Sequence, residues 1–594
     1  MLALGFGAGV ARVALVDAAK LERATQRFEA EACIAEITPR ATYTQLVVKD
    51  WSASAPLPAG FAANQRWRSP PEDMRPGERI ALNVRLFPVH GALYPGSYDP
   101  RRTAFFKGVG GEGWIGKATQ RIGKCREPTS LENARRWFRA RLIEIVPTAA
   151  GGLLVGVTTG WRGDIPRDEI RPMRDASLGH LLAISGLHVG LAVGLILFTV
   201  RALLALVPRL ALRYPIKKWA AAVGLIAGVA YLAFSGGSVP TQRAMIMLGL
   251  VLLALLFDRI ELSMRPIAWA AVIVLAASPE AILSPSFQLS FAAVIGLDAV
   301  FETWRRYRTR QHNIGHRWPL VLRYLVGVAA TTLIATFATM PFAAFHFHRI
   351  ALVGLAANLI AVPVFAFWVM PALLIGVVLL PFGLEGVPWH VAGMGADLIL
   401  SIADRLTGWE GAVANAGIMP EWGIGLMVLG GLWWALWQER WRWLGVPLVL
   451  AGLIAPLTAN PPDMIVGEKH LAFSAGNGRY WIQGKLGFVS GIWLHETGTR
   501  PLRWPNYPAL GTRGRRLACD SQACRYTSAE GQLATLIDPA AGNECSQAAF
   551  AVSKVPIRDC ERWPRYGETL VIDLDDGIAR VESSWGGERP WNGP

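Results

Sequence analysis

Five long stretches without a single Asp, Glu, Lys or Arg decide which class of protein this chain belongs to. They cover residues 181–200, 219–242, 324–348, 350–384 and 443–462. A helix needs about 20 apolar residues to cross the hydrocarbon core of a bilayer, so each stretch is long enough to span it. The composition agrees, because 52% of the residues are hydrophobic and only 17% are charged. The sequence therefore predicts a polytopic α-helical membrane protein.

Weaker spans raise the expected number of crossings to about nine to eleven. They lie at residues 266–283, 286–303, 387–405 and 422–438. The stretch 350–384 is too long for one untilted helix, and we expect two passes or a re-entrant pair around Pro363 or Pro371. Residues 1–16 form a short apolar run that contains Arg12. This run is either a signal segment or the end of a membrane helix whose beginning is missing.

The charge of the connecting loops predicts the orientation, because short loops rich in Lys and Arg stay in the cytoplasm. The basic loops are 207–218, 258–265, 304–323 and 438–442, whereas 235–240 and 279–285 carry no positive charge. Counting through these loops places both soluble regions, 17–140 and 461–594, on the extracytoplasmic side. The formal charge of +15 fits such loops, anionic lipid or a nucleic-acid partner, and does not choose among them.

The cysteines support the same orientation. All lie in the two soluble regions and none lies in a span, as expected where disulfides form. They are Cys33, Cys125, Cys519, Cys524, Cys545 and Cys560. We expect these residues to pair in that order, the first with the second and so on. A zinc site with four thiolates is the alternative, but such sites commonly use closer spacings such as C-x2-C.

Alternating apolar residues indicate β-strands in the region 17–140. The clearest case is ERIALNVRLF at 78–87, where every second position from Ile80 to Leu86 is apolar. We expect a small β-barrel or sandwich. Between the strands, Arg66, Trp67 and Arg68 combine a stacking surface with two cations, as a platform for a single nucleic-acid strand does. The alternative is a solvated loop anchored by one Trp.

Polar and small residues interrupt several of the predicted spans, and they suggest a hydrated passage. These candidate lining positions are Ser185, Gly186, His188, Gly190, Gln242, Arg243, Glu280, Gln288, Ser290, His346 and Asn358. Two of them have simpler interpretations. His188 would equally serve as a hydrogen-bonding partner of a neighbouring helix carbonyl, and Arg243 would snorkel to the membrane surface.

Four motifs resemble, in order, those of the ComEC family of competence proteins. HLLAISGLHVGL is similar to the most characteristic motif of that family, and SVPTQRAMIM, LSPSFQLSFAAV and ATMPFAAFHFHRIALVGLAANLIAVP are similar to further membrane motifs. YPGSYDPRRTAFFKGVGGEGWIG also resembles the end of the family's amino-terminal OB-type domain. The resemblance runs from about residue 30 to about residue 460.

The resemblance implies transport of single-stranded DNA across the cytoplasmic (inner) membrane during natural transformation. It implies four segments: the remnant at 1–16, an OB-like domain at 17–140 that receives the strand, a helical channel domain at 141–460, and a carboxy-terminal domain at 461–594. The expected partners are single-stranded DNA, membrane lipid and other DNA-uptake proteins on both sides of the membrane. Whether the DNA passes through a single chain or through a homodimer is left open by the sequence.

The carboxy-terminal region departs from many members of that family, which end in a metallo-β-lactamase-like domain with an H-x-H-x-D-H metal cluster. Residues 461–594 contain only two histidines, far apart and outside this pattern. We therefore expect an α/β or β-rich domain that is a degenerate version of it, without enzymatic activity, metal or cofactor. Two alternatives remain: a transporter or exporter of another polyanion or small solute, and an enzyme with its active site in this domain.

Overall fold

The computed structural model describes the chain from residue 2 to residue 583 apart from a set of short segments. The segments outside the described part are 40–42, 55, 69–70, 72–73, 96, 116–119, 183, 259–263, 311–318, 417, 460–461, 468–469, 478, 484–490, 492, 495–499, 504–508, 511–514, 520–522, 529–532, 538–549, 554–560, 563–568 and 576–577.

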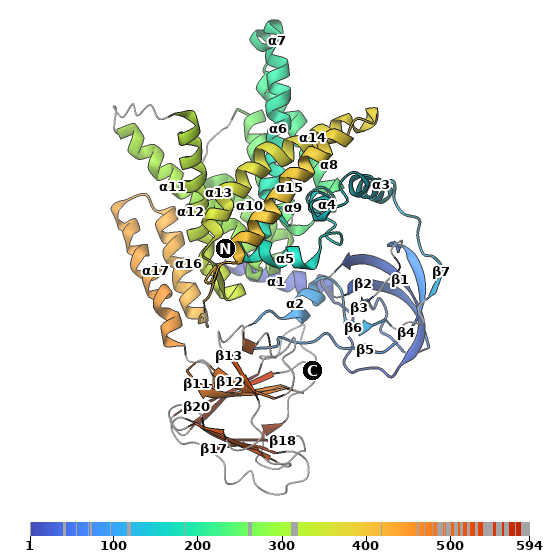
Figure 1. The fold of residues 1–594 in the computed structure, drawn as a ribbon, viewed down its shortest axis with the longest axis vertical. Helices are drawn as coiled ribbons and strands as arrows, with labels where there is room; N and C mark the ends of the chain where they lie inside the picture. The colour runs from blue at the N-terminus through green and yellow to red at the C-terminus, as the bar shows by residue number, and fades with distance from the viewer. Residues whose placement is uncertain are drawn as a thin grey trace.

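The amino-terminal region is a helix followed by a small β-domain (Figure 1). The elements are α1 (Leu2–Val16), β1 (Phe28–Pro39), β2 (Thr44–Ala53), β3 (Ala63–Trp67), β4 (Glu78–Val84), β5 (Leu86–Phe87), α2 (Pro100–Phe106), β6 (Gly111–Trp114) and β7 (Gln120–Lys124). The strands form one sheet in the order β5-β6-β3-β2-β1-β4-β7. Residues 1–16, expected to be a signal or membrane remnant, thus contain a helix.

The β-domain is closed into a barrel by one bent strand. Only Arg85 separates β4 from β5, and β4 pairs with β1 while β5 pairs with β6. β5, at one end of the sheet order, therefore continues directly from β4, the second strand from the other end, and β3 pairs with β6 in parallel. Ile80 and Leu86 are fully buried inside the barrel, which confirms the predicted alternation.

A disulfide joins Cys33 in β1 to Cys125, directly after β7, as predicted. In the carboxy-terminal region Cys524 is disulfide-bonded, and Cys519 lies opposite it in the strand pairing. The side chain of Cys519, and the whole of Cys545 and Cys560, lie outside the described residues. The two predicted carboxy-terminal pairs therefore stay predictions.

A bundle of helices follows the β-domain. The helices are α3 (Ser130–Ile145), α4 (Ala149–Thr159), α5 (Arg167–Asp175), α6 (Gly186–Ala205), α7 (Pro208–Arg213), α8 (Ile216–Phe234), α9 (Val239–Leu256), α10 (Met264–Ala277), α11 (Pro285–Arg310), α12 (Leu320–Phe347), α13 (Gly354–Val364), α14 (Met370–Leu379), α15 (Gly386–Thr407), α16 (Glu421–Leu436) and α17 (Gly445–Ile454). Short 3-10 helices lie between them, including η1 (Gly179–Leu181), η2 (Pro279–Leu283), η4 (Leu380–Phe382), η5 (Arg440–Leu444) and η6 (Ala455–Thr458). A two-stranded sheet, β8 (Arg349–Ala351) with β9 (Val413–Asn415), pairs two loops.

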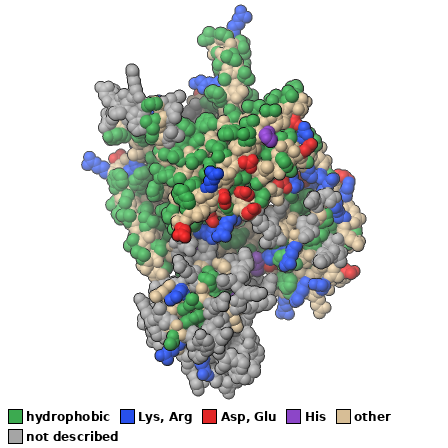
Figure 2. Space-filling view, viewed as in Figure 1, with side chains coloured by type: hydrophobic (Ala, Val, Ile, Leu, Met, Phe, Trp, Pro, Cys, Tyr) green, Lys and Arg blue, Asp and Glu red, His purple; other side chains and the backbone are tan. Residues whose placement is uncertain are grey.

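Six helical segments in the described part of the chain are long and apolar enough to cross a membrane. They are Gly186–Ala205, Ile216–Phe234, Val239–Leu256, Leu322–Phe347, Gly354–Phe382 and Arg440–Thr458. Shorter apolar helices, among them α10 and α16, lie beside them. Figure 2 shows apolar side chains covering most of the visible face of the bundle. The protein is therefore a multi-pass membrane protein, as expected, whereas the full predicted count of about nine to eleven spans remains a prediction.

The stretch 350–384 does not fold as two passes or as a re-entrant pair, and this prediction is wrong. Residues Gly354–Phe382 form one continuous helical segment. Its middle, Phe365–Val369, is a π-helical turn called η3, which begins two residues after Pro363. A proline removes one backbone N–H donor, and a local π-turn lets the helix continue without a break.

One helix of the bundle, α4, is almost entirely buried, and the sequence did not single it out. Every residue of α4 from Ala150 to Thr159 is buried, although the helix is too short to span a bilayer. It packs in one apolar core with α15, whose Trp389 has no exposed surface. Trp389 fits because Gly376 has no side chain: a Cβ atom there would lie 2.2 Å from the indole Cδ1.

The carboxy-terminal domain consists of two β-sheets. One contains β10 (Met464–Gly467), β11 (Leu471–Gly476), β12 (Arg479–Ile482), β13 (Arg500–Arg503), β20 (Thr569–Asp575) and β21 (Ile578–Ser583). The other contains β14 (Ala509–Leu510), β15 (Arg516–Cys519), β16 (Ala523–Thr527), β17 (Leu533–Ile537), β18 (Phe550–Ser553) and β19 (Glu561–Arg562). Of the two expected classes, the described part of this domain is the β-rich one.

A buried carboxylate connects the two sheets. Asp463 accepts hydrogen bonds from the hydroxyl of Tyr526 on β16 and from the backbone N–H of Leu574 on β20, each at 3.1 Å. Burial raises the pKa of Asp463 above its ordinary value.

Both β-domains lie at one end of the helix bundle, and α7 lies at the other (Figure 1). The helix α7 contains Arg209 and Arg213 of the basic loop 207–218. This arrangement is compatible with the predicted topology, in which both soluble domains share one side. The assignment of that side as extracytoplasmic rests on the charges of the loops and on the positions of the cysteines.

Candidate functional site

One outward face of the β-barrel carries a row of side chains suited to contact a ligand. Strand pairing sets Gln45 on β2 opposite Arg66 on β3, and Arg66 opposite Trp114 on β6. Because side chains alternate along a strand, these three lie on the same face, while Leu46 and Gln65 point into the barrel. Gln45 and Arg66 are polar and Trp114 is exposed, so this face is not part of the barrel core.

Two arginines and two aromatic rings meet on this face. The guanidinium of Arg66 lies 5.7 Å from the ring centroid of Tyr43 and 5.6 Å from that of Trp114. The guanidinium of Arg68 lies 5.4 Å from the Trp114 ring, and Trp114 is 44% exposed. We call Tyr43, Arg66, Arg68 and Trp114 the β-face cluster. Its distances are those of cation–π contacts.

The structure thus brings together two of the three residues predicted here. Trp67 instead packs, half-buried, against the barrel core. Tyr43 and Trp114 were not predicted, because they come from segments far from Arg66 in the sequence. The one sequence signal for Trp114 was its position in the motif GEGWIG. Nothing in the sequence indicates that this segment pairs with β3.

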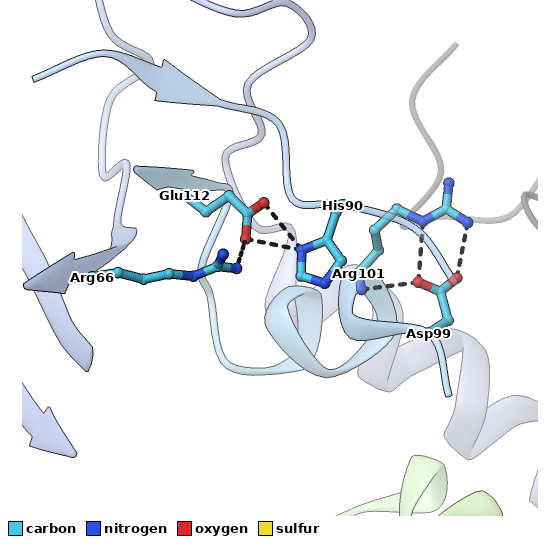
Figure 3. A network of polar contacts seen from close by, with 5 residues as sticks. All are labelled: Arg66, His90, Asp99, Arg101 and Glu112. Carbon is cyan, nitrogen blue, oxygen red and sulfur yellow. Dashed lines mark hydrogen bonds and ion pairs between the residues drawn. The ribbon is translucent and has the colours of Figure 1, made fainter. Parts of the chain in front are cut away.

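A buried carboxylate holds Arg66 in place (Figure 3). Glu112 on β6 accepts a hydrogen bond from Nη2 of Arg66 at 2.7 Å, and Nδ1 of His90 lies 3.0 Å from both oxygens of the same carboxylate. Beside this network, the guanidinium of Arg101 bonds to the carboxylate of Asp99 through Nε at 3.1 Å and Nη2 at 2.9 Å. Glu112 therefore orients Arg66 and offsets part of its charge.

Exposed indole and phenol rings flanked by guanidinium groups have a definite chemical use. An aromatic ring offers a face on which any nucleobase stacks, and a nearby guanidinium offers N–H donors to a phosphate. Such a surface tolerates different sequences because every base has a π-face. The β-face cluster therefore has the chemistry of a single-strand binding platform.

Within the bundle, His188 lies in the first turn of α6. Its Nδ1 accepts a hydrogen bond from the backbone N–H of Ser185 at 3.1 Å and lies 2.9 Å from the Ser185 hydroxyl. The ring is fully buried and packs edge-on against Phe365 in the π-helical turn, with ring centroids 4.8 Å apart. His188 therefore caps its own helix, and its Nε2 has no hydrogen-bond partner on a neighbouring helix among the described residues. A role in lining a passage remains a prediction.

Two other predicted positions meet across helices. Nε2 of His346 at the end of α12 lies 2.6 Å from Oε1 of Gln288 in the first turn of α11. The amide nitrogen of Gln288 donates to the carbonyl of Ile282 in η2 at 3.0 Å. These contacts form a polar link between two consecutive helices, and the two side chains that meet lie 58 positions apart in the sequence.

Arg243 and Glu280 also have partners in distant segments. Nη2 of Arg243 donates to the carbonyl and to the hydroxyl of Ser286 at 2.8 and 2.7 Å. Glu280 forms an ion pair with Arg12 of α1 at 3.4 Å. Arg243 is therefore buried against another helix and does not snorkel.

The remaining predicted positions make local contacts or none that is described. The amide of Gln242 bonds to the carbonyl of Gly237 at 2.8 Å, and that of Asn358 to the carbonyl of Gly354 at 2.7 Å. A Cβ atom at Gly186 would lie 3.8 Å from Ala244, so the two helices approach closely there. No atom of the described part of the chain lies within 4 Å of a Cβ built at Gly190, and Ser290 lies half-buried in α11. The structure does not gather these residues into one site.

Comparison with known proteins gives an independent line of evidence. The family model described as Competence protein matches residues 157–441. The chain is 26% identical over 470 residues to an uncharacterized protein, YcaI, of Escherichia coli (strain K12), and this match covers 73% of the chain and 57% of that protein. It is 24% identical over 342 residues to ComE operon protein 3 of Bacillus subtilis (strain 168), a match that covers 56% of the chain and 40% of that protein.

A third relative is competence protein ComA of Neisseria gonorrhoeae, which is 28% identical over 317 residues, covering 52% of the chain and 42% of that protein. The chain thus spans about half the length of the curated relatives it matches. No solved structure gives a significant match. In the described residues, no group of three or more His, Cys, Asp or Glu side chains is placed to hold a metal ion.

Proposed function

We propose that this chain, which belongs to the ComEC family of competence proteins, conducts single-stranded DNA across the cytoplasmic membrane during natural transformation. The observation that carries the proposal is the β-face cluster, in which two arginines and two aromatic rings share one exposed surface. One relative, ComA, is named as a competence protein, and the region matched by the family model includes most of the membrane helices.

The strand pairing of the β-domain supports an OB-like assignment. In an OB-fold, five strands form a Greek-key barrel, and oligonucleotides bind across the face of its second and third strands. Here β1, β2, β3, β6 and the bent strand β4–β5 form a closed barrel. The β-face cluster lies at β2, β3 and β6 of that barrel. We propose that this domain is extracytoplasmic and receives the strand before it reaches the membrane.

The helix bundle would then provide the passage. A polyanion crosses a bilayer only where polar or cationic groups replace water around it. Gln288 with His346 and the buried Arg243 provide such groups on α9, α11 and α12. We further propose that the carboxy-terminal domain is not an enzyme, that a separate protein degrades the complementary strand, and that the chain works with other DNA-uptake proteins.

The central experiment measures binding of a fluorescent oligothymidine to the purified full chain in lipid nanodiscs. Replacing a stacking ring costs about 1–3 kcal/mol per base, so Trp114→Ala should weaken binding about 5-fold to 150-fold. The double variant Arg66→Gln/Arg68→Gln should also lower the salt dependence of binding, because each lost phosphate contact removes about 0.7 from its slope. Arg209→Gln on α7, at the far end of the bundle, is the matched control and should bind like the wild type.

Two results would reject the proposed function. One is a wild-type chain that binds no oligonucleotide, and the other is a set of cluster variants that bind as tightly as the control. Equal affinity for an inorganic polyphosphate of the same length would favour the alternative, transport of another polyanion on the same scaffold, because stacking on Trp114 and Tyr43 would then contribute nothing.

A further inference from the structure

The guanidinium of Arg243 is buried in the bundle with most of its donors unpaired. Arg243 is 3% exposed, and only its Nη2 has a described partner, Ser286. Nε and Nη1, which together carry three N–H groups, have no hydrogen-bond partner in the described part of the chain. No ion pair joins Arg243 to a carboxylate among the described residues either.

Such an arrangement is costly unless an anion completes it. A buried charge without a counter-ion carries a desolvation penalty of several kcal/mol by general estimates, and Arg remains protonated at any physiological pH. Its planar fork of N–H groups fits the oxygens of a phosphate. Arg243 therefore has the charge, the free donors and the geometry of one half of a phosphate site.

The location of Arg243, close to a segment that the β-domain also contacts, indicates which anion would reach it. Its partner Ser286 is in the first turn of α11. Three residues earlier, Nη2 of Arg102 on α2 donates to the carbonyl of Leu283 at 3.4 Å. The two guanidinium groups thus bind either end of the same short segment, one from the β-domain side and one from inside the bundle. The segment continues to Glu280, which pairs with Arg12 of α1.

We propose that Arg243 binds a phosphodiester group of the transported strand, deeper in the bundle than Arg102. This inference rests on the proposed function and names the anion that the bundle recognises first. Because Arg243 is almost fully buried, the phosphate reaches it only when the first turn of α11 moves away from α9. The contact between Arg243 and Ser286 then closes the site when no strand is present.

The test compares the salt dependence of oligothymidine binding to the full chain in nanodiscs for the wild type, Arg243→Gln and Arg442→Gln. Arg442 is the matched control, because it is also a buried arginine of the bundle, but its Nε and Nη1 both donate, to Trp434 and Thr303, and only its Nη2 has no partner among the described residues. Arg243→Gln should reduce the slope of log affinity against log salt by about 0.7, the value for one phosphate, and Arg442→Gln should leave it unchanged. An oligonucleotide with an uncharged methylphosphonate backbone should bind the wild type and Arg243→Gln equally.

A measurement on the wild-type protein covers the case in which Arg243→Gln does not fold. An oligonucleotide carrying a photoreactive group on a backbone phosphorothioate should cross-link to peptides from the starts of α9 and α11. Cross-links confined to the β-domain would overturn the inference. An unchanged salt slope in folded Arg243→Gln would also overturn the inference. If native mass spectrometry then shows that this variant has lost a phospholipid that the wild type retains, the anion bound by Arg243 is a lipid headgroup. In both cases the proposed function would survive as long as the wild type binds the strand.

Discussion

Trp493 in the carboxy-terminal domain donates its indole N–H to the backbone carbonyl of Leu93, 400 positions earlier in the chain, at 2.8 Å. The next residue, Tyr94, is buried in the same apolar cluster as Trp493 and Tyr480. The loop between β5 and α2 is therefore anchored in the carboxy-terminal domain. Because His90 in that loop contacts Glu112, the anchored loop and the β-face cluster are connected through a short chain of contacts.

Trp493→Phe should loosen this anchored loop. The substitution keeps most of the ring packing but leaves the carbonyl of Leu93 without its donor, which costs about 1–3 kcal/mol for a buried group. We expect faster hydrogen exchange across residues 88–99, measured by mass spectrometry on the full chain. Tyr98→Phe is the control in the same loop, because its hydroxyl bonds to Thr103 at an exposed position. Exchange rates equal to those of the wild type in Trp493→Phe would show that the contact does not hold the loop.

Much of the fold followed from local patterns. The alternation from Ile80 to Leu86 predicted a strand with one buried face, and the uncharged stretches predicted the long spans. Both patterns act within one element, so the sequence displays them directly. The helix α4 was not predicted because eleven residues are too few for a span, although every residue after Ala149 is buried.

The candidate site was less predictable because it depends on pairing between distant elements. Arg66 and Arg68 were visible in the sequence, but Trp114 joins them only through the parallel pairing of β3 with β6. The role of His188 also depended on context, since a histidine at the third position of a helix caps it only if the helix begins at Gly186. Likewise, Pro363 suggested a chain break, and the π-helical turn that accommodates it cannot be recognised from composition.

Glu112→Gln should strengthen the response of strand binding to salt. Glutamine keeps an oxygen that accepts from Arg66 but removes the negative charge that competes with phosphate for its guanidinium. The slope of log affinity against log salt should steepen by about 0.7, measured with the oligothymidine assay. Glu29→Gln on β1 is the control for a general change in charge. Weaker binding with an unchanged slope would mean that the carboxylate acts only by positioning Arg66.

Gly376→Ala should destabilise the bundle core. The new Cβ atom would lie 2.2 Å from the ring of Trp389, which is fully buried and cannot move into solvent. Overpacking of this kind costs about 1–3 kcal/mol, so thermal unfolding of the protein in detergent should begin at a lower temperature. Gly425→Ala in α16 is the matched control, because no atom of the described residues lies within 4 Å of the position that its new methyl group would take. A variant as stable as this control would show that Trp389 has room to shift.

The connection between the β-domain and the bundle should show a defined dependence on acid. Glu132 receives hydrogen bonds from Arg126 at 2.6 Å and from the backbone N–H of Thr129 at 2.8 Å, at the start of α3. The hydrogen bond from Arg126 is the main reason that the pKa of Glu132 falls from 4.5 to about 2. A carboxylate with a lowered pKa stabilises the folded state above its ordinary pKa, and this contribution is lost as the pH falls through the folded value.

The wild type should therefore unfold at a higher temperature than Arg126→Gln at pH 6. This difference in unfolding temperature should shrink as the pH falls from 4.5 to about 2, the pKa of Glu132 in the folded protein. Lys124→Gln, which removes a neighbouring and exposed ion pair with Glu127, should show no such trend. A difference between wild type and Arg126→Gln that stays constant with pH would mean that the guanidinium acts through packing rather than through the charge of Glu132.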